Sequence, residues 1–210
     1  MTDHYEEEAQ VEQLKRWWKE NWKSLLLGLI LGLAVIVGWE GYQRYQRQQA
    51  EQASQLYEDL KSALSAHKTD EAVALGDKLI HDFARTPYAT SAAFYLAQLA
   101  VDQNKADEAA TRLQWVVDHG KDASLKELAK LRLARVLWQQ QKTDDALKLL
   151  DGEHGAYNAL FVELRGDIKL SMNDRAGARE AYEQALGMVE GANRMLLQRK
   201  LDDLADVVKS

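Results

Sequence analysis

The side chains best suited to metal binding or acid–base catalysis are five histidines, and their spacing favours neither chemistry. They are His4, His67, His81, His119 and His154. A zinc site built on one helix needs two histidines about four residues apart, so that both rings face the same side. No two of these histidines are that close. The spacing predicts no metal site, and we expect the histidines at solvent-exposed helix ends.

Other motifs that would indicate an enzyme are absent from the sequence as well. The chain has no cysteine, which excludes disulfides, thiolate metal sites and a cysteine nucleophile. It has no G-x-S-x-G turn around a serine and no glycine-rich phosphate loop. We therefore expect a protein that catalyses nothing, needs no cofactor, takes no small-molecule substrate and works by binding other proteins.

Six residues are candidates for that binding because they take matching inward places in an internal repeat. They are Phe94 and Gln98, Arg135 and Trp138, and Glu163 and Asp167. Arginine and tryptophan are enriched at the centres of protein interfaces, so Arg135 with Trp138 is a candidate anchor pair. The alternative is that Phe94 and Trp138 are core residues, as large apolar side chains usually are. The sequence leaves both interpretations open.

The elements that carry these residues are predicted to be helices. The 210-residue chain has one proline, Pro87, and is rich in alanine, leucine, glutamine, glutamate and lysine, which are good helix formers. This composition predicts an all-α fold. The formal net charge of -6 gives no basic surface to displace the counterions of a nucleic acid, so no nucleic acid is expected as a partner.

One uncharged stretch indicates a helix that crosses a lipid bilayer. Residues 24–39 read SLLLGLILGLAVIVGW and would extend about 24 Å as a helix. Aromatic residues flank the stretch on both sides, as they do at membrane interfaces: Trp17, Trp18, Trp22, Trp39, Tyr42 and Tyr45. A buried core helix and a cleavable signal peptide are the alternatives, but an acidic N-terminus and the lack of an A-x-A-like site fit a signal peptide poorly. We predict a transmembrane helix at 23–42.

The basic residues around this span predict its orientation. Four precede it closely and two follow it: Lys15, Arg16, Lys19, Lys23, and then Arg44 and Arg47. Because basic residues favour the cytoplasmic side, residues 1–22 are expected in the cytoplasm and residues 43–210 in the periplasm of a bacterial cell. The tail has apolar residues near helical spacing, which suggests an amphipathic stretch on the inner leaflet.

Two glycines within the span could pack against another transmembrane helix. Gly28 and Gly32 form a G-x-x-x-G pair, which lets two helix backbones approach closely. The alternative is that glycine is simply common in transmembrane helices.

A repeated phrase follows the span and predicts helix-turn-helix units. It reads KTDEA from Lys68, KADEA from Lys105, KTDDA from Lys142 and, less well kept, DRAGA from Asp174, at intervals of 37, 37 and 32 residues. Such units bury their apolar faces by stacking. We predict helix pairs at 50–67 with 70–83, 89–104 with 107–119, 125–141 with 144–150 and 158–173 with 175–189, the first helix continuing directly from the span.

Each second helix is expected to begin with a capping side chain. The candidates are Asp70, Asp107 and Asp144, or Thr69 and Thr143. A last helix, which keeps Met195, Leu196, Leu204 and Val207 apolar among charged residues, should close the array as a capping helix.

Small residues recur where paired helices would cross, with a bulky residue four positions after the second one. The sets are Ala97, Ala109 and Leu113; Ala134, Ala146 and Leu150; and Gly166, Ala178 and Tyr182. This is the tetratricopeptide pattern. In the first unit Ala72 is kept, but Gly76 takes the place of the bulky residue. The fold predicted is one transmembrane helix followed by a tetratricopeptide-like solenoid of about four helix pairs and a capping helix.

Taken together, these features resemble the YfgM-like family, the ancillary subunits of the bacterial SecYEG translocon. The resemblance is carried by QVEQLKRWWKEN before the span, the G-x-x-x-G span ending in GW, LRLAR at Leu131, DALKLLD at Asp145 and LRGDIKLSMNDRAGAREAYE at Leu164. It implies a single-pass inner-membrane protein whose partners are the SecYEG translocon and periplasmic chaperones, especially a membrane-anchored prolyl-isomerase-like one. It implies no catalytic residues.

Two other functions remain open at this stage. The same architecture could tether a different membrane or outer-membrane assembly complex as a general envelope scaffold. A regulatory protein, whose cytoplasmic tail engages a soluble factor, would require residues 1–22 to do more than lie on the membrane surface.

Overall fold

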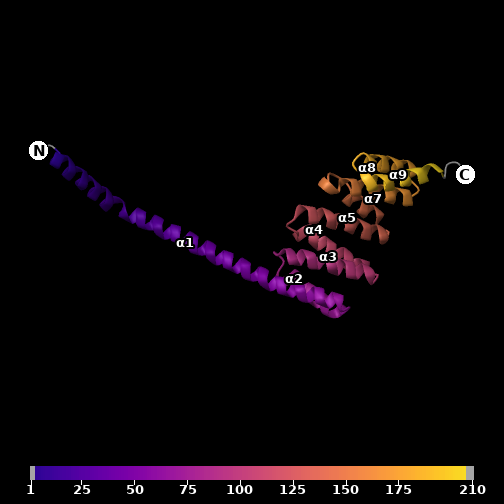
Figure 1. Ribbon diagram of the computed structural model, residues 1–210, viewed down its shortest axis with the longest axis horizontal. Helices are drawn as coiled ribbons and strands as arrows, with labels where there is room; N and C mark the ends of the chain where they lie inside the picture. Colours follow the sequence, from indigo (N-terminus) through magenta and orange to yellow (C-terminus); the bar gives the residue numbers. More distant parts are fainter. Residues whose placement is uncertain (1–2, 207–210) are drawn as a thin grey trace. The chain divides into compact units, whose positions relative to one another are not determined.

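The computed structural model describes the backbone of residues 3–206 and the side chains of residues 11, 12 and 14–204. Within that part of the chain the secondary structure is entirely helical, which confirms the all-α prediction (Figure 1). The helices are α1 (Asp3–Ser65), α2 (Thr69–Asp82), α3 (Pro87–Asp102), α4 (Ala106–His119), α5 (Ala123–Gln139), α6 (Thr143–Leu149), the 3₁₀-helix η1 (Gly155–Tyr157), α7 (Asn158–Ser171), α8 (Arg175–Leu186) and α9 (Gly191–Asp206).

The chain divides into two compact units, Met1–Glu51 and Gln52–Ser210. The first contains most of α1, whose stretch Leu14–Ser65 is the one described helix long and apolar enough to cross a membrane. Its large apolar side chains are exposed, with Leu29 at 61% and Val35 at 71%. In water such a surface would be costly. The predicted continuation of this helix beyond the span is confirmed, since α1 is unbroken to Ser65.

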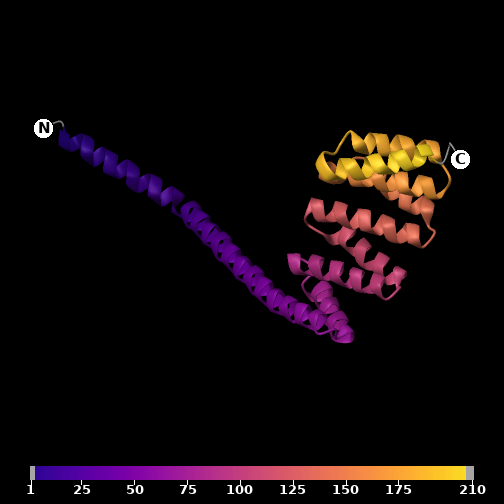
Figure 2. The same cartoon turned by 45° about the vertical axis from the view of Figure 1, so that its right-hand side comes forward.

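The second unit is a stack of antiparallel helix pairs, which confirms the predicted tetratricopeptide-like solenoid (Figure 2). Its first pair joins the end of α1 to α2, and the pairs α3 with α4, α5 with α6 and α7 with α8 follow along the chain. The end of α1 packs here, with Ala53 and Leu60 fully buried against α2 and α3. Each pair thus buries the apolar face that the neighbouring pair leaves open.

The four turns within the pairs share one backbone conformation. Each contains a residue with positive φ, namely His67, Asn104, Gln141 and Asn173 at 55°, 60°, 63° and 63°. In the first turn the Lys68 N–H donates to the Ala63 carbonyl at 2.9 Å and the His67 N–H donates to the Leu64 carbonyl at 3.1 Å. The other three turns repeat both bonds. This Schellman motif satisfies the last carbonyls of the first helix.

The prediction that a side chain caps each second helix is wrong for three of the four. The residues that precede α2, α4 and α6 are Lys68, Lys105 and Lys142, and none caps through its side chain. Asp70 and its equivalents Asp107 and Asp144 lie inside the first helical turn, where a carboxylate still interacts favourably with the helix dipole. Thr69 and Thr143 are the first helical residues of α2 and α6. The Schellman turn, rather than a side chain, fixes these helix starts.

The small residues of the repeat lie where expected. Ala97, Ala134, Ala109, Ala146 and Ala178 are all buried at the contacts between helices. Gly166 is the extreme case, because a Cβ there would lie 2.5 Å from Cε1 of Tyr182. In the first unit Leu60 stands at the repeat position of the small residue, and a Cβ on Gly76 would lie 2.8 Å from Leu96 of the next helix pair. The packing therefore depends on matched side-chain volumes.

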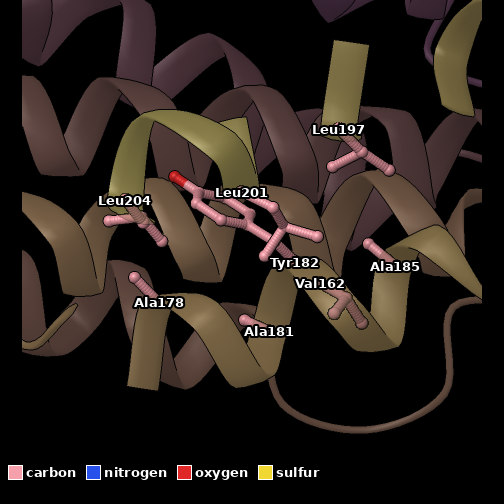
Figure 3. Packing of buried hydrophobic residues seen from close by; sticks show 8 residues of the cluster. All are labelled: Val162, Ala178, Ala181, Tyr182, Ala185, Leu197, Leu201 and Leu204. Carbon is pink, nitrogen blue, oxygen red and sulfur yellow. The ribbon is translucent and has the colours of Figure 1, made fainter. Parts of the chain in front are cut away.

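The capping helix α9 packs through a stripe that contains one of the predicted residues, Leu204, but not Met195 or Leu196. Leu197, Leu201 and Leu204 are buried against α8, in a cluster that also contains Tyr182 (Figure 3). These leucines are four and three residues apart and so share one helix face. Met195 and Leu196, which we expected to pack, are 62% and 55% exposed because they fall outside that face. Val207 lies outside the described residues.

Candidate protein-binding groove

Two adjoining cavities lie along the first helices of the first three pairs. One has a volume of about 410 Å³ and lies between the end of α1, α3 and α5; the other has about 360 Å³ and lies between α3 and α5 over the side of α4. Phe94, Gln98 and Arg132 line both. We call this combined surface the arginine groove. Its principal lining residues are Tyr57, Phe94, Tyr95, Gln98, Arg132 and Arg135.

The repeat explains why these side chains converge. Tyr57 and Phe94 are 37 residues apart, and so are Tyr95 and Arg132. Residues separated by one full repeat take equivalent places on successive first helices. Helices α1, α3 and α5 therefore present them on one side of the second unit.

Two arginines give the groove its charge. Arg132 and Arg135 are exposed on one face of α5, three residues apart. Arg132 places its guanidinium over the Phe94 ring at 5.0 Å from the centroid. None of the lining residues is acidic, and neither arginine forms an ion pair with another described residue. The groove is thus locally basic in a chain whose net charge is -6.

Aromatic rings form the other part of the groove. The Tyr57 ring lies 6.1 Å from the Tyr95 ring and 5.4 Å from the Tyr88 ring. Burial, followed by hydrogen bonding to Tyr95, raises the pKa of Tyr57 above its ordinary value. Tyr95 itself is 42% exposed. The groove offers apolar contact area together with hydroxyl groups and cations, as protein interfaces do.

Three of the six residues predicted to bind protein meet in this groove. Phe94 is half-buried, and Gln98 and Arg135 are exposed. Trp138 is not among the lining residues; it is partly buried against the α5–α6–α7 cluster, and its indole N–H donates to Ser171 Oγ at 3.2 Å. In the repeat register Leu131, not Trp138, is the equivalent of Phe94, and Trp138 is the equivalent of Val101.

The remaining two, Glu163 and Asp167, are engaged by the capping helix. Lys200 of α9 donates to Glu163 Oε1 at 2.7 Å and to Asp167 Oδ1 at 2.6 Å, and the Tyr182 hydroxyl donates to Asp167 Oδ1 at 2.8 Å. Although burial opposes it, these two carboxylates raise the pKa of Lys200. Burial and the bond to Asp167 raise the pKa of Tyr182 well above its usual range. The carboxylates of Glu163 and Asp167 are therefore satisfied within the chain.

Sequence reasoning missed three groove residues: Tyr57, Tyr95 and Arg132. A signal for them existed, since Tyr57 lies one repeat before Phe94 and Arg132 one repeat after Tyr95. The conformation of the first helices decides which of several neighbouring polar and aromatic residues faces the groove.

His154 is a correction to the expectation that the histidines are exposed. It is 5% exposed, stacks on Phe161 with centroids 3.5 Å apart, and its Nδ1 lies 2.7 Å from Glu127 Oε2. Against the effect of burial, hydrogen bonds from Lys130 and His154 hold the pKa of Glu127 below its ordinary value. His154 belongs to the segment after the short helix α6, which folds inward onto α5. His67, His81 and His119 are exposed, and the side chain of His4 lies outside the described residues.

A larger cavity of about 720 Å³ lies between α4 and α6, where α6 is short. Its charged side chains are of both signs, and Lys148 is paired with Asp145 at 3.0 Å. Because its charges partly neutralise each other, this cavity has less unpaired charge to offer a ligand than the arginine groove. Across the described residues no group of three His, Cys, Asp or Glu side chains could hold a metal ion.

The two glycines of the span have open space around them. A Cβ on Gly28 or Gly32 would meet no atom within 4 Å. Their face of α1 is free of other described residues, and their packing against another helix stays a prediction.

Comparisons with known proteins give a consistent result. The family model described as a tetratricopeptide repeat-like domain matches residues 15–206. A protein of Escherichia coli (strain K12) named ancillary SecYEG translocon subunit is 36% identical over 98% of this chain and 100% of its own length. Proteins of the same name from Neisseria gonorrhoeae and Haemophilus influenzae are 33% and 30% identical, each over 97% of this chain and 100% of the relative.

Proposed function

The chain belongs to the family of ancillary SecYEG translocon subunits, and from that membership we propose that it is a non-enzymatic accessory of the translocon that brings periplasmic chaperones to emerging chains. The observation that carries this proposal is the presence in one chain of an exposed apolar helix and a helical-repeat unit with a basic and aromatic groove. The helix supplies a membrane anchor, and the groove supplies a surface for partners.

The anchor fits a single-pass inner-membrane protein. Residues 23–42 form its transmembrane part, residues 1–22 lie in the cytoplasm, and residues 43–210 form the periplasmic domain. The excess of basic residues ahead of the span supports this orientation, because such residues remain on the cytoplasmic side.

The repeat domain works by binding rather than by chemistry. The candidate partner is a membrane-anchored prolyl-isomerase-like chaperone, as the family resemblance implies. Phe94, Gln98 and Arg135, together with the neighbouring Tyr57, Tyr95 and Arg132, form the proposed contact surface. Trp138, Glu163 and Asp167 have partners within the chain, so their role in binding is less direct.

Co-purification from membranes in mild detergent tests the proposal. A C-terminally tagged chain should recover SecY. A chain with Gly28→Leu and Gly32→Leu should recover less of it, because large side chains prevent close helix approach. Gly38→Leu is the matched control: Gly38 also has open space around it but lies on another helix face.

Each outcome has a distinct meaning. Loss of SecY from the Gly38→Leu control as well as from the Gly28→Leu, Gly32→Leu variant would point to general damage of the helix. Recovery of a different stable complex without SecY would favour the general envelope scaffold and contradict the translocon role.

A further inference from the structure

We propose that the arginine groove binds an extended peptide segment in which an acidic side chain lies among apolar ones. This rests on the binding role proposed above and adds the chemical class of the ligand. The occupant is a segment of a partner protein, recognised by its carboxylate and by its apolar neighbours.

Charge is the first argument. Arg132 and Arg135 project from one face of α5, and the cavities around them contain no carboxylate. Arginine presents a planar set of donors that matches a carboxylate in two parallel hydrogen bonds. An acidic side chain placed between α3 and α5 would satisfy cations that the described part of the chain leaves without an ion pair.

In the fourth helix pair, the charged residue at the repeat position of Arg135 is paired with another residue of this chain. Asp167 lies 32 residues after Arg135 and is its equivalent in the fourth pair. There the charge is met by Lys200 of α9 at 2.6 Å. Among the described residues, no helix supplies an oppositely charged partner for the arginines between the second and third pairs. The groove thus lacks a complementary charge that the repeat elsewhere supplies.

The apolar part of the ligand follows from the rings and aliphatic side chains. Tyr95 and Val101 are 42% and 36% exposed, and Phe94 lines both cavities. The Phe94 ring also supports the Arg132 guanidinium from one side. Such stacking leaves the edge of the guanidinium free to bind a carboxylate.

Gln98 supplies contacts for a peptide backbone. Its amide nitrogen donates to Asp102 Oδ1 at 2.8 Å, which orients the side chain and leaves its carbonyl oxygen available to a peptide N–H. Asp102 itself is not a lining residue of either cavity. The combined cavities fall within the size range of specific ligand sites, and their open form suits an extended chain.

The experiment measures peptide binding to the full-length protein in detergent by fluorescence anisotropy. The probe is a labelled ten-residue peptide that alternates Leu or Phe with Glu. The comparison peptides replace every Glu by Gln or by Lys. We expect the Glu peptide to bind about tenfold more tightly than the Gln peptide, as charge-assisted hydrogen bonds allow, and the Lys peptide to bind least.

Variants assign the effect to the groove. Arg132→Gln with Arg135→Gln should remove the preference for Glu, whereas Arg132→Lys with Arg135→Lys should restore part of it. The matched control is Arg175→Gln with Arg179→Gln, which removes two exposed arginines of α8 outside the groove. Circular dichroism melting confirms that each variant is folded.

Three results would overturn the inference: equal binding of the Glu and Gln peptides, tighter binding of the Lys peptide, or an unchanged preference in the Arg132→Gln, Arg135→Gln variant. A dimer that this variant abolishes, seen by light scattering, would assign the groove to a second copy of the chain instead. Recovery of SecY by the wild-type chain separates the two proposals, since it upholds translocon association even if the peptides show no preference.

Discussion

At the scale of single residues, the packing of the repeat rests on pairs of side chains whose sizes compensate. Gly166 faces the ring of Tyr182 at the place where other pairs combine alanine with leucine, as Ala134 does with Leu150. Tyr182 can fill this position only because Gly166 has no side chain. The tyrosine then reaches Asp167 with its hydroxyl group, which links packing to the polar contacts of α9.

Replacing Gly166 by alanine should destabilise the protein by about 1–3 kcal/mol, because the new Cβ would overlap a buried ring. Thermal unfolding of the full chain in detergent measures this. In a Tyr182→Leu background the same change should cost much less, so a double-mutant cycle should give a clear coupling energy. Gly187→Ala, at an exposed helix end with ordinary contacts, should change little; equal effects at both glycines would contradict the account.

Glu127 makes a pH-dependent contribution to stability. Its folded-state pKa is lowered, so the stabilisation is present above the pKa of the unfolded state and is lost as the pH falls through the lower, folded-state value. Glu127→Gln should lose about 1–2 kcal/mol near neutral pH and show a shallower loss on acidification below about pH 4.5. Urea unfolding at several pH values measures both effects. The exposed Glu180→Gln serves as control, and parallel pH profiles for wild type and Glu127→Gln would refute the role of this residue.

Residue-level prediction from the sequence reached the groove only in part. Phe94, Gln98 and Arg135 were identified by their interval, but Arg132, Tyr57 and Tyr95 were not. Arg132 and Arg135 have the same chemistry in the sequence, and only the packing of α5 shows that both line the groove. His154 could not have been placed, because its burial depends on a contact with Glu127, 27 residues away.

At the scale of elements, the turn between paired helices repeats more faithfully than any side-chain motif. The sequence correctly placed these turns at the polar phrases, and the boundaries agree within a few residues. It assigned the wrong capping groups because the Schellman turn uses main-chain bonds, which leave no requirement for Asp or Thr at the following position. The positive φ of Gln141 could not be predicted from the residue type, because the position is neither glycine nor asparagine.

The capping helix is fixed by both leucines and charge. Lys200→Met should leave Glu163 without its ion-pair partner and Asp167 with only its hydrogen bond from Tyr182, which we expect to cost about 1–2 kcal/mol for partly exposed groups. Hydrogen exchange followed by mass spectrometry should show that this variant exchanges faster than the wild type in α9, with little change in α4 or α5.

Arg199→Met is the matched control, because Arg199 is exposed on the same helix. Exchange in α9 that is unaffected by Lys200→Met would mean that Leu197, Leu201 and Leu204 alone hold the helix in place.

At the scale of the whole molecule, one helix apolar enough to cross a membrane and one helical-repeat unit belong to a single chain. The sequence predicted both, because long apolar stretches and repeat intervals are strong signals. The side of the membrane on which the repeat unit lies is a prediction from basic residues on either side of the span.

Protease added to intact spheroplasts should digest the repeat unit of a C-terminally tagged chain, because the proposed orientation exposes this unit on the periplasmic side. A cytoplasmic marker protein should stay intact in the same sample. Protection of the tag until the membrane is dissolved would place the domain in the cytoplasm and reverse the proposed orientation.

The most direct measurement is photo-crosslinking in growing cells from a photoreactive phenylalanine analogue at Tyr95, an exposed position in the arginine groove. Met172, which is 53% exposed and is not a groove residue, is the control site. The account predicts that Tyr95, far more than Met172, yields adducts with periplasmic or exported proteins in complexes that also contain SecY. Adducts confined to cytoplasmic proteins, or equal yields from both sites, would contradict it.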